Sequence, residues 1–101
     1  MPDESTEIAP EVKKEVGTVI SKLKEAGWKV TASLHDPKLF GNWYVDLYRA
    51  GISMRIVKDR SPYMVSGPQQ EVKAAGLWRA FDNLEEFVGA FLHWEWAVSP
   101  Q

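Results

Sequence analysis

Two stretches of the chain repeat apolar residues at the three- and four-residue spacing of a helix with one buried face. The first runs from about Pro10 to Ala26, with Gly27 at the position where a left-handed residue commonly ends a helix. The second follows Asp82 or Asn83, either of which can cap it. The apolar positions are Val12, Val16, Val19, Ile20 and Leu23 in the first stretch, and Leu84, Phe87, Val88, Phe91 and Leu92 in the second.

Between these helices, apolar and polar residues alternate in four short segments, which is typical of strands with one buried face. The segments are residues 28–34, 43–49, 52–58 and 63–67. The side chains expected to face inward are Trp28, Val30, Ala32, Leu34, Trp43, Val45, Leu47, Ile52, Met54, Ile56, Tyr63 and Val65. His35 to Asn42 contains Asp36-Pro37 and predicts a loop, and one helical turn is expected around Glu71.

The second and third segments have a self-consistent register. Pairing Arg49 with Ile52 across a two-residue turn sets apolar residues against apolar residues and Asp46 against Arg55. Short connections require an antiparallel meander, and both helices need the same apolar sheet face. The sequence therefore predicts an α+β fold in the order α-β-β-β-β-α, a four-stranded antiparallel meander with N- and C-terminal helices on one face. Residues 1–9 are expected to fray, and 10–101 to form a single domain.

Composition narrows the class of protein. The chain has 101 residues and no cysteine, which excludes disulfides and thiolate chemistry and is typical of a reducing cytosol. No apolar leader or long apolar run is present, so we expect a cytoplasmic protein without membrane contact. The net charge of −2 argues against a nucleic-acid partner. Residues 1–11 and 80–101 carry acids without lysine or arginine, which either favours a basic protein partner or only suits the N-terminal turns of the helices.

Little in the sequence points to catalysis. His35 is followed by Asp36, and a carboxylate can orient a histidine for acid–base work, but the same residues suit a turn before a proline. No nucleophile or second base lies at a recognisable spacing, and His93-x-Glu95 matches no metal-ligand pattern. We expect no catalytic residue, cofactor or metal. A small ligand-binding or hydrolytic domain that uses the His35 loop is the alternative.

The outer face of the predicted sheet is the main candidate for binding a protein partner, because aromatic residues, methionine and arginine are enriched in interfaces. Its candidate residues are Tyr44, Asp46, Tyr48, Arg55 and Met64. Trp94 and Trp96 are added as a second patch, unless the helix ends near His93 and the tail buries both indoles. The same face could instead carry aromatic residues for their strand propensity alone, or form a homodimer.

Gly17 and Gly89 occupy matching positions in the two helices, five residues after the first apolar position of each. Glycine inside a helix is unfavourable, so two matched glycines favour close helix–helix packing. The alternative is that both lie on a solvated edge.

One part of the sequence resembles a known kind of protein. GISMRIVKDRSPYMVSGP followed by LWRAFDNLEEFVGAFL is similar to a pattern in small bacterial domains of the toxin-immunity type, some of which have no assigned role. There, a strand ends in Asp-Arg-Gly, a short strand follows, and a tryptophan leads into the last helix. Ser61 stands here in place of the glycine. The resemblance implies a cytoplasmic, non-enzymatic protein that acts by binding another protein.

Overall fold

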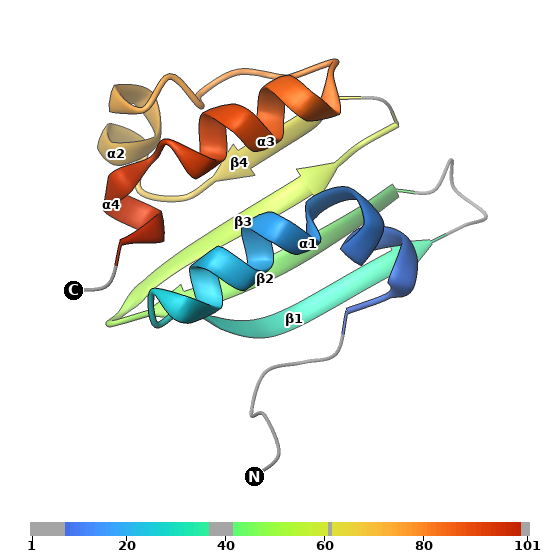
Figure 1. The fold of residues 1–101 in the computed structure, drawn as a ribbon, viewed down its shortest axis with the longest axis horizontal. Coiled ribbons are helices and arrows are strands. Elements are labelled where there is room, and N and C mark those ends of the chain that lie inside the picture. Colours follow the sequence, from blue (N-terminus) through green and yellow to red (C-terminus); the bar gives the residue numbers. More distant parts are fainter. Residues whose placement is uncertain (1–7, 37–41, 61, 100–101) are drawn as a thin grey trace, which may run out of the picture.

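Four strands form one antiparallel sheet in the order β1-β2-β3-β4, and helices precede and follow it (Figure 1). The computed structural model describes residues 8–36, 42–60 and 62–99. The elements are α1 (Pro10–Glu25), β1 (Lys29–Asp36), β2 (Asn42–Arg49), β3 (Ile52–Lys58), β4 (Tyr63–Ser66), α2 (Gln69–Ala74), α3 (Leu84–Leu92) and α4 (Glu95–Val98). The predicted α+β meander with terminal helices is confirmed. None of the described helices is long and apolar enough to cross a membrane.

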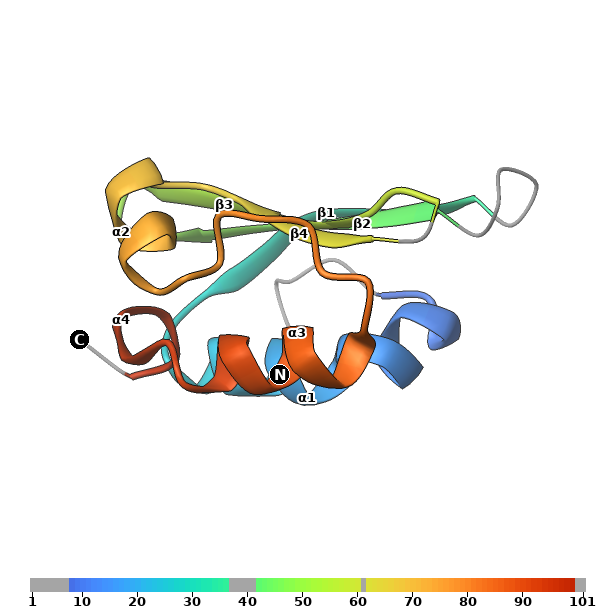
Figure 2. The ribbon, with the colours of Figure 1, turned by 90° about the horizontal axis from the view of Figure 1, so that it is seen from above.

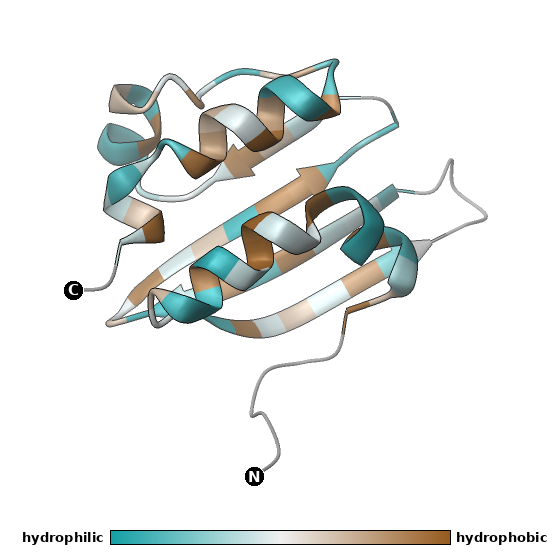
Figure 3. Cartoon of the chain, viewed as in Figure 1, coloured by the Kyte–Doolittle hydropathy of each residue, from teal (hydrophilic) through white to brown (hydrophobic). Residues whose placement is uncertain are grey.

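The helices α1, α3 and α4 lie on one side of the sheet, which gives the molecule two layers (Figure 2). Hydrophilic and hydrophobic residues are interleaved along β2 and β3, as the two-residue period of a sheet with unlike faces requires (Figure 3). The predicted β2–β3 register is confirmed, with Arg49 opposite Ile52 and Asp46 opposite Arg55.

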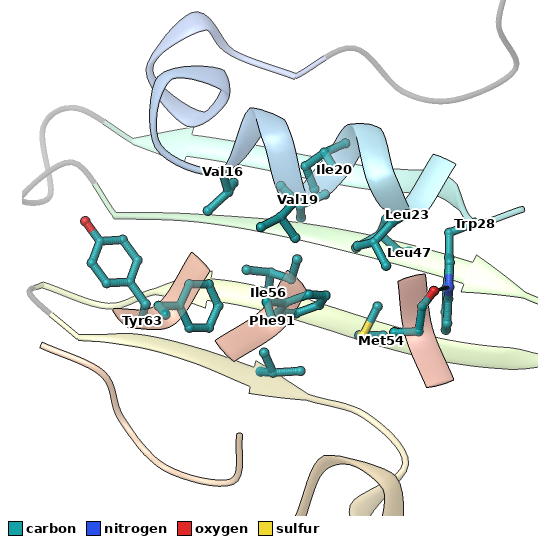
Figure 4. Packing of buried hydrophobic residues seen from close by; sticks show 14 of the residues in the cluster. Val16, Val19, Ile20, Leu23, Trp28, Leu47, Met54, Ile56, Tyr63 and Phe91 are labelled. Carbon is teal, nitrogen blue, oxygen red and sulfur yellow. Dashed lines mark hydrogen bonds between the residues drawn. The ribbon is translucent and has the colours of Figure 1, made fainter. Parts of the chain in front are cut away.

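Val16, Val19 and Leu23 of α1 pack against the inner face of β2 and β3 (Figure 4). Ile8, in the segment expected to fray, is also buried in this core. A chain of ring contacts continues the core through α3 to the C-terminal turn, with centroids 5.3–5.9 Å apart. Its members are Tyr63, Phe87, Phe91, Trp94, Trp96 and Trp28. The core therefore depends on the tail as well as on the sheet.

Gly27 ends α1 in the left-handed conformation, with φ of +102°, as its place in the sequence predicts. The N–H of Gly27 bonds to the Lys24 carbonyl and the N–H of Trp28 bonds to the Leu23 carbonyl, the two bonds of a Schellman cap. The cap turns the chain sharply, so that buried Trp28 leads directly into β1.

A β-bulge in β1 overturns part of the predicted strand pattern. Val30 pairs with Leu47 while Ala32 pairs with Asp46, so Thr31 is an extra residue and the inside–outside alternation reverses beyond it. Leu34, predicted to face inward, instead lies on the outer face and is 50% exposed. β1 also runs through His35 to Asp36, so the predicted loop begins later than expected.

The C-terminal segment also differs from an uninterrupted helix. α3 ends at Leu92, His93 is its C-cap, and α4 begins at Glu95. Trp94 is buried, and Trp96 is half-buried against Trp28 and Trp94. The helix therefore ends near His93 and the tail folds back, as the alternative predicts, but it buries Trp94 fully and Trp96 only in part.

The prediction that the two helices pack closely at Gly17 and Gly89 is wrong. A Cβ added at Gly89 would meet nothing within 4 Å, and one at Gly17 would meet only the Cβ of Lys13 at 3.8 Å.

Because alanine has the higher helix propensity and space is available, Gly89→Ala should raise the free energy of unfolding by about 0.5–1 kcal/mol. Urea denaturation followed by tryptophan fluorescence measures the change. A loss of stability would mean that another group occupies this space.

Candidate functional site

The outer face of the sheet is the side without α1, α3 and α4 (Figure 2). Four side chains cross it in one register: Leu34 pairs with Tyr44, Tyr44 with Val57, and Val57 with Met64. We call Leu34, Tyr44, Val57 and Met64 the outer row. With neighbouring strands about 4.8 Å apart, the outer row spans about 14 Å across all four strands.

Two hollows flank the outer row. One, of about 250 Å³, is lined by all four members together with residues at the start of β2 and the end of β3. The other, of about 310 Å³, lies between Val57, Met64 and Trp78. Both hollows touch Val57 and Met64, so the apolar surface continues from Leu34 to Trp78, which is 48% exposed.

A charged pair lies beside the outer row. Arg55 donates from Nε to Asp46 Oδ1 at 2.6 Å and from Nη2 to Oδ2 at 2.9 Å. The Arg55 guanidinium carbon is 4.0 Å from the Tyr44 ring centroid, within cation–π range. The Asp46 carboxylate raises the pKa of Arg55 through its hydrogen bond and charge, which outweigh the opposing effect of burial. Tyr44 is therefore held in place by a bidentate pair.

A more polar hollow of about 430 Å³ adjoins this pair, with Thr31, Ser53 and Ser66 in its lining. Thr31 Oγ1 donates to the Asp46 carbonyl at 3.3 Å, which ties the bulge in β1 to β2. On the outer face, the apolar outer row thus lies next to a group of hydrogen-bonding side chains.

The structure brings five of the seven predicted partner-binding residues together on one face. These are Tyr44, Asp46, Tyr48, Arg55 and Met64. Trp94 and Trp96 lie with the helical layer instead, in the ring contacts of the core.

The set of predicted site residues omitted three side chains of the surface, which are Leu34, Val57 and Trp78. Leu34 was assigned to the core because no residue type in segment 28–34 announces the bulge. Trp78 corresponds to the tryptophan that leads into the last helix in the sequence resemblance, and a tryptophan among loop residues is in itself a signal of interaction.

His35 faces the helical layer rather than a cleft. It pairs with Trp43 on the inner face, its side chain is 15% exposed, and its Nδ1 lies 3.9 Å from Glu11 Oε2. None of the hollows described above is lined by His35. Among residues 8–36, 42–60 and 62–99, no group of three potential ligands could hold a metal ion.

The acids that indicated a basic partner lie elsewhere. Glu85 and Glu86 are exposed in the first turn of α3, on the helical side of the sheet. Asn83 caps this helix by accepting a hydrogen bond from the Glu86 N–H at 3.0 Å, so one of the predicted caps is confirmed. The basic partner remains a prediction about a surface other than the outer face.

Comparisons of the chain with protein-family models, with curated proteins and with solved structures found no match.

Proposed function

We propose that this chain is a non-enzymatic protein-binding domain, of the kind that neutralises a bacterial toxin, and that it binds its partner through the outer sheet face. The observation that carries the binding role is the outer row, an apolar line in register across four strands with no described helix over it. Apolar surface of this kind, rimmed by polar groups, is typical of interaction sites. The toxin-immunity assignment rests on the sequence resemblance alone.

The charged pair supports a specific interface over a general one. Tyrosine and arginine are among the residues enriched at the energetic centres of interfaces, and Tyr44 and Arg55 contact each other here. A partner that covers the outer row would also exclude water from the Asp46–Arg55 pair. Partners with polar groups that match the pair would then bind more tightly than partners without them.

The products of the genes adjacent to this one are the candidate partners to test. Each is titrated with the purified chain by calorimetry, and each candidate toxin is co-expressed with the chain in a growth assay. We expect one product to bind and its toxicity to be suppressed. A set of neighbours that neither bind nor inhibit growth would contradict the toxin-immunity assignment.

A double substitution, Leu34→Lys with Met64→Lys, tests the surface. It should weaken binding by about tenfold or more, because two charges would be buried in an apolar contact. Thr18→Lys with Ser21→Lys adds the same charge on exposed positions of α1 and should leave binding unchanged. Equal weakening by both pairs, or by the α1 pair alone, would mean that the outer face is not the interface. Sedimentation of the free chain shows whether it is a monomer or forms a homodimer through this face.

A further inference from the structure

A hollow of about 310 Å³ lies beside Trp78, between the sheet and the loop that follows α2. We call it the Trp78 hollow. Its lining comes from three elements that are distant in sequence: β3, β4 and the segment before α3. The lining residues are Val57, Met64, Val65, Ser66, Trp78, Arg79 and Ala80.

Trp78 is exposed, yet the residues just before it are held in place by hydrogen bonds and buried side chains. Gly76, with φ of +75°, ends α2 in a Schellman cap, in which its N–H bonds to the Lys73 carbonyl and the Leu77 N–H bonds to the Val72 carbonyl. Val72 and Leu77 are both fully buried and supply the apolar contact of this motif. An indole that stays exposed on an anchored backbone loses little conformational freedom when a partner binds.

The rim of the Trp78 hollow is cationic. Lys73 Nζ lies 5.6 Å from the Trp78 ring centroid. The Arg79 guanidinium carbon lies 3.9 Å from the Phe81 ring centroid. Neither cation has an acidic side chain within 4 Å among the residues that the structure describes. Glu71 and Asp82 are close in sequence but form no ion pair with them. Both positive charges are thus available to a ligand.

The edge of β4 adds hydrogen-bonding groups. Tyr63 exchanges both backbone hydrogen bonds with Phe81, at 2.8 and 2.9 Å, on the side of β4 away from β3. Because these groups alternate along an antiparallel strand, the N–H and C=O of Val65 point to the same side. No hydrogen bond within the described residues reaches either group, and Val65 lines the hollow. A bound peptide backbone could pair with them.

We propose that the Trp78 hollow is the anchor point for the protein partner, and that it takes a short acidic segment. A bulky apolar side chain of that segment inserts between Trp78 and Met64, and a neighbouring carboxylate pairs with Lys73 or Arg79. This inference rests on the proposed protein-binding role and names the chemistry of its partner. It places the energetic centre at one end of the outer row.

Short synthetic peptides test the inference without the natural partner. The probe is a nine-residue peptide with a central phenylalanine flanked by glutamates, titrated into the ¹⁵N-labelled full chain. We expect the indole signal of Trp78 and the amide signals of Val65 and Ser66 to shift. Replacing the glutamates by lysines, or the phenylalanine by alanine, should weaken binding about tenfold or more.

Variants of the chain provide the matched controls. Trp78→Ala should weaken the acidic peptide by about tenfold or more, and Lys73→Gln with Arg79→Gln should weaken it and remove its salt dependence. Lys14→Gln with Lys22→Gln removes two exposed charges from α1 and should have little effect at moderate salt. Thermal melts confirm that each variant folds.

Three results would overturn the inference. Equal affinity for the acidic and the basic peptide would show that the cationic rim does not select an acidic segment. Shifts confined to the signals of Leu34 and Tyr44 would show that the peptide does not bind in the Trp78 hollow. Tighter binding of a six-nucleotide oligothymidine than of the acidic peptide would identify nucleic acid as the ligand class. If Trp78→Ala keeps full affinity for a natural partner that Leu34→Lys with Met64→Lys rejects, the proposed function stands and this inference fails.

Discussion

Replacing Arg49 with methionine should lower the free energy of unfolding by about 3–4 kcal/mol, because four backbone carbonyls lose their charged donor. Arg49 Nη1 donates to the carbonyls of Ala26 at 3.1 Å, Ser99 at 3.2 Å and Ala97 at 3.5 Å, and Nη2 donates to the Trp96 carbonyl at 2.9 Å. These carbonyls lie at the end of α1 and around α4. One side chain thus joins the sheet to both chain segments.

Arg49 is held by aromatic rings as well as by carbonyls. Its guanidinium carbon is 4.7 Å from the Trp28 ring centroid and 5.6 Å from that of Trp96. Burial lowers the pKa of Arg49, but a guanidinium stays charged in a protein. Within the described chain no carboxylate pairs with it, so carbonyl dipoles and ring faces alone stabilise its charge.

Two further arginine variants make the test specific. Arg49→Lys keeps the charge but loses the planar fork, and should cost about 2 kcal/mol. Arg55→Met removes an exposed arginine from the same sheet and should cost only about 0.2–1 kcal/mol. Urea denaturation measures all three. If Arg49→Met costs no more than Arg55→Met, water must replace the guanidinium at these carbonyls, and Arg49 does not hold the tail.

The meander could be predicted because the patterns that determine it lie within single strands and the short turns between neighbouring strands. Alternation gives each strand its inner face, and the turn at Ala50 and Gly51 fixes the register that sets Asp46 against Arg55. Alternation even places Arg49 inward, after Trp43, Val45 and Leu47. It cannot say that the carbonyls of a tail about 50 residues away will accept its hydrogen bonds.

The candidate site was predicted in part for the same reason. Tyr44, Arg55 and Met64 follow from alternation in β2, β3 and β4. Leu34 does not, because one extra residue reverses the faces of β1 without changing the pattern of residue types. Trp78 lies in a segment without periodicity, and its position depends on the cap of α2 and on the buried side chain of Leu77.

Glu15 is the second side chain whose removal should be costly, because it accepts three hydrogen bonds at the junction of α1 with the sheet. Tyr63 donates its hydroxyl to Glu15, Trp43 Nε1 donates at 3.0 Å, and Lys58 Nζ donates at 3.5 Å. The next residue, Val16, departs from helical geometry, with φ of −123° and ψ of 17°. The network therefore fixes the first part of α1 against β2, β3 and β4.

At pH 7, Glu15→Ala should lower the free energy of unfolding by about 2–4 kcal/mol, since buried donors on Trp43 and Tyr63 would lose their acceptor. Burial raises the pKa of Glu15, but the hydrogen bonds from Tyr63 and Trp43 and the charge of Lys58 outweigh it, so its pKa is lower than usual. The same burial, with the adjacent carboxylate, raises the pKa of Tyr63. The hydroxyl therefore remains a donor throughout the acid range.

The lowered pKa gives this stabilisation a pH dependence of known sign. Between the folded and unfolded pKa values of Glu15 the unfolded chain binds more protons, so its contribution is complete above the unfolded value of 4.5 and is lost as the pH falls through the folded value. The difference in unfolding free energy between the wild type and Glu15→Gln should therefore shrink as the pH is lowered below 4.5. Glu25→Gln, an exposed carboxylate variant on the same helix, is the control. A difference that stays constant from pH 7 into acid would show that the charge of Glu15 contributes nothing beyond its shape.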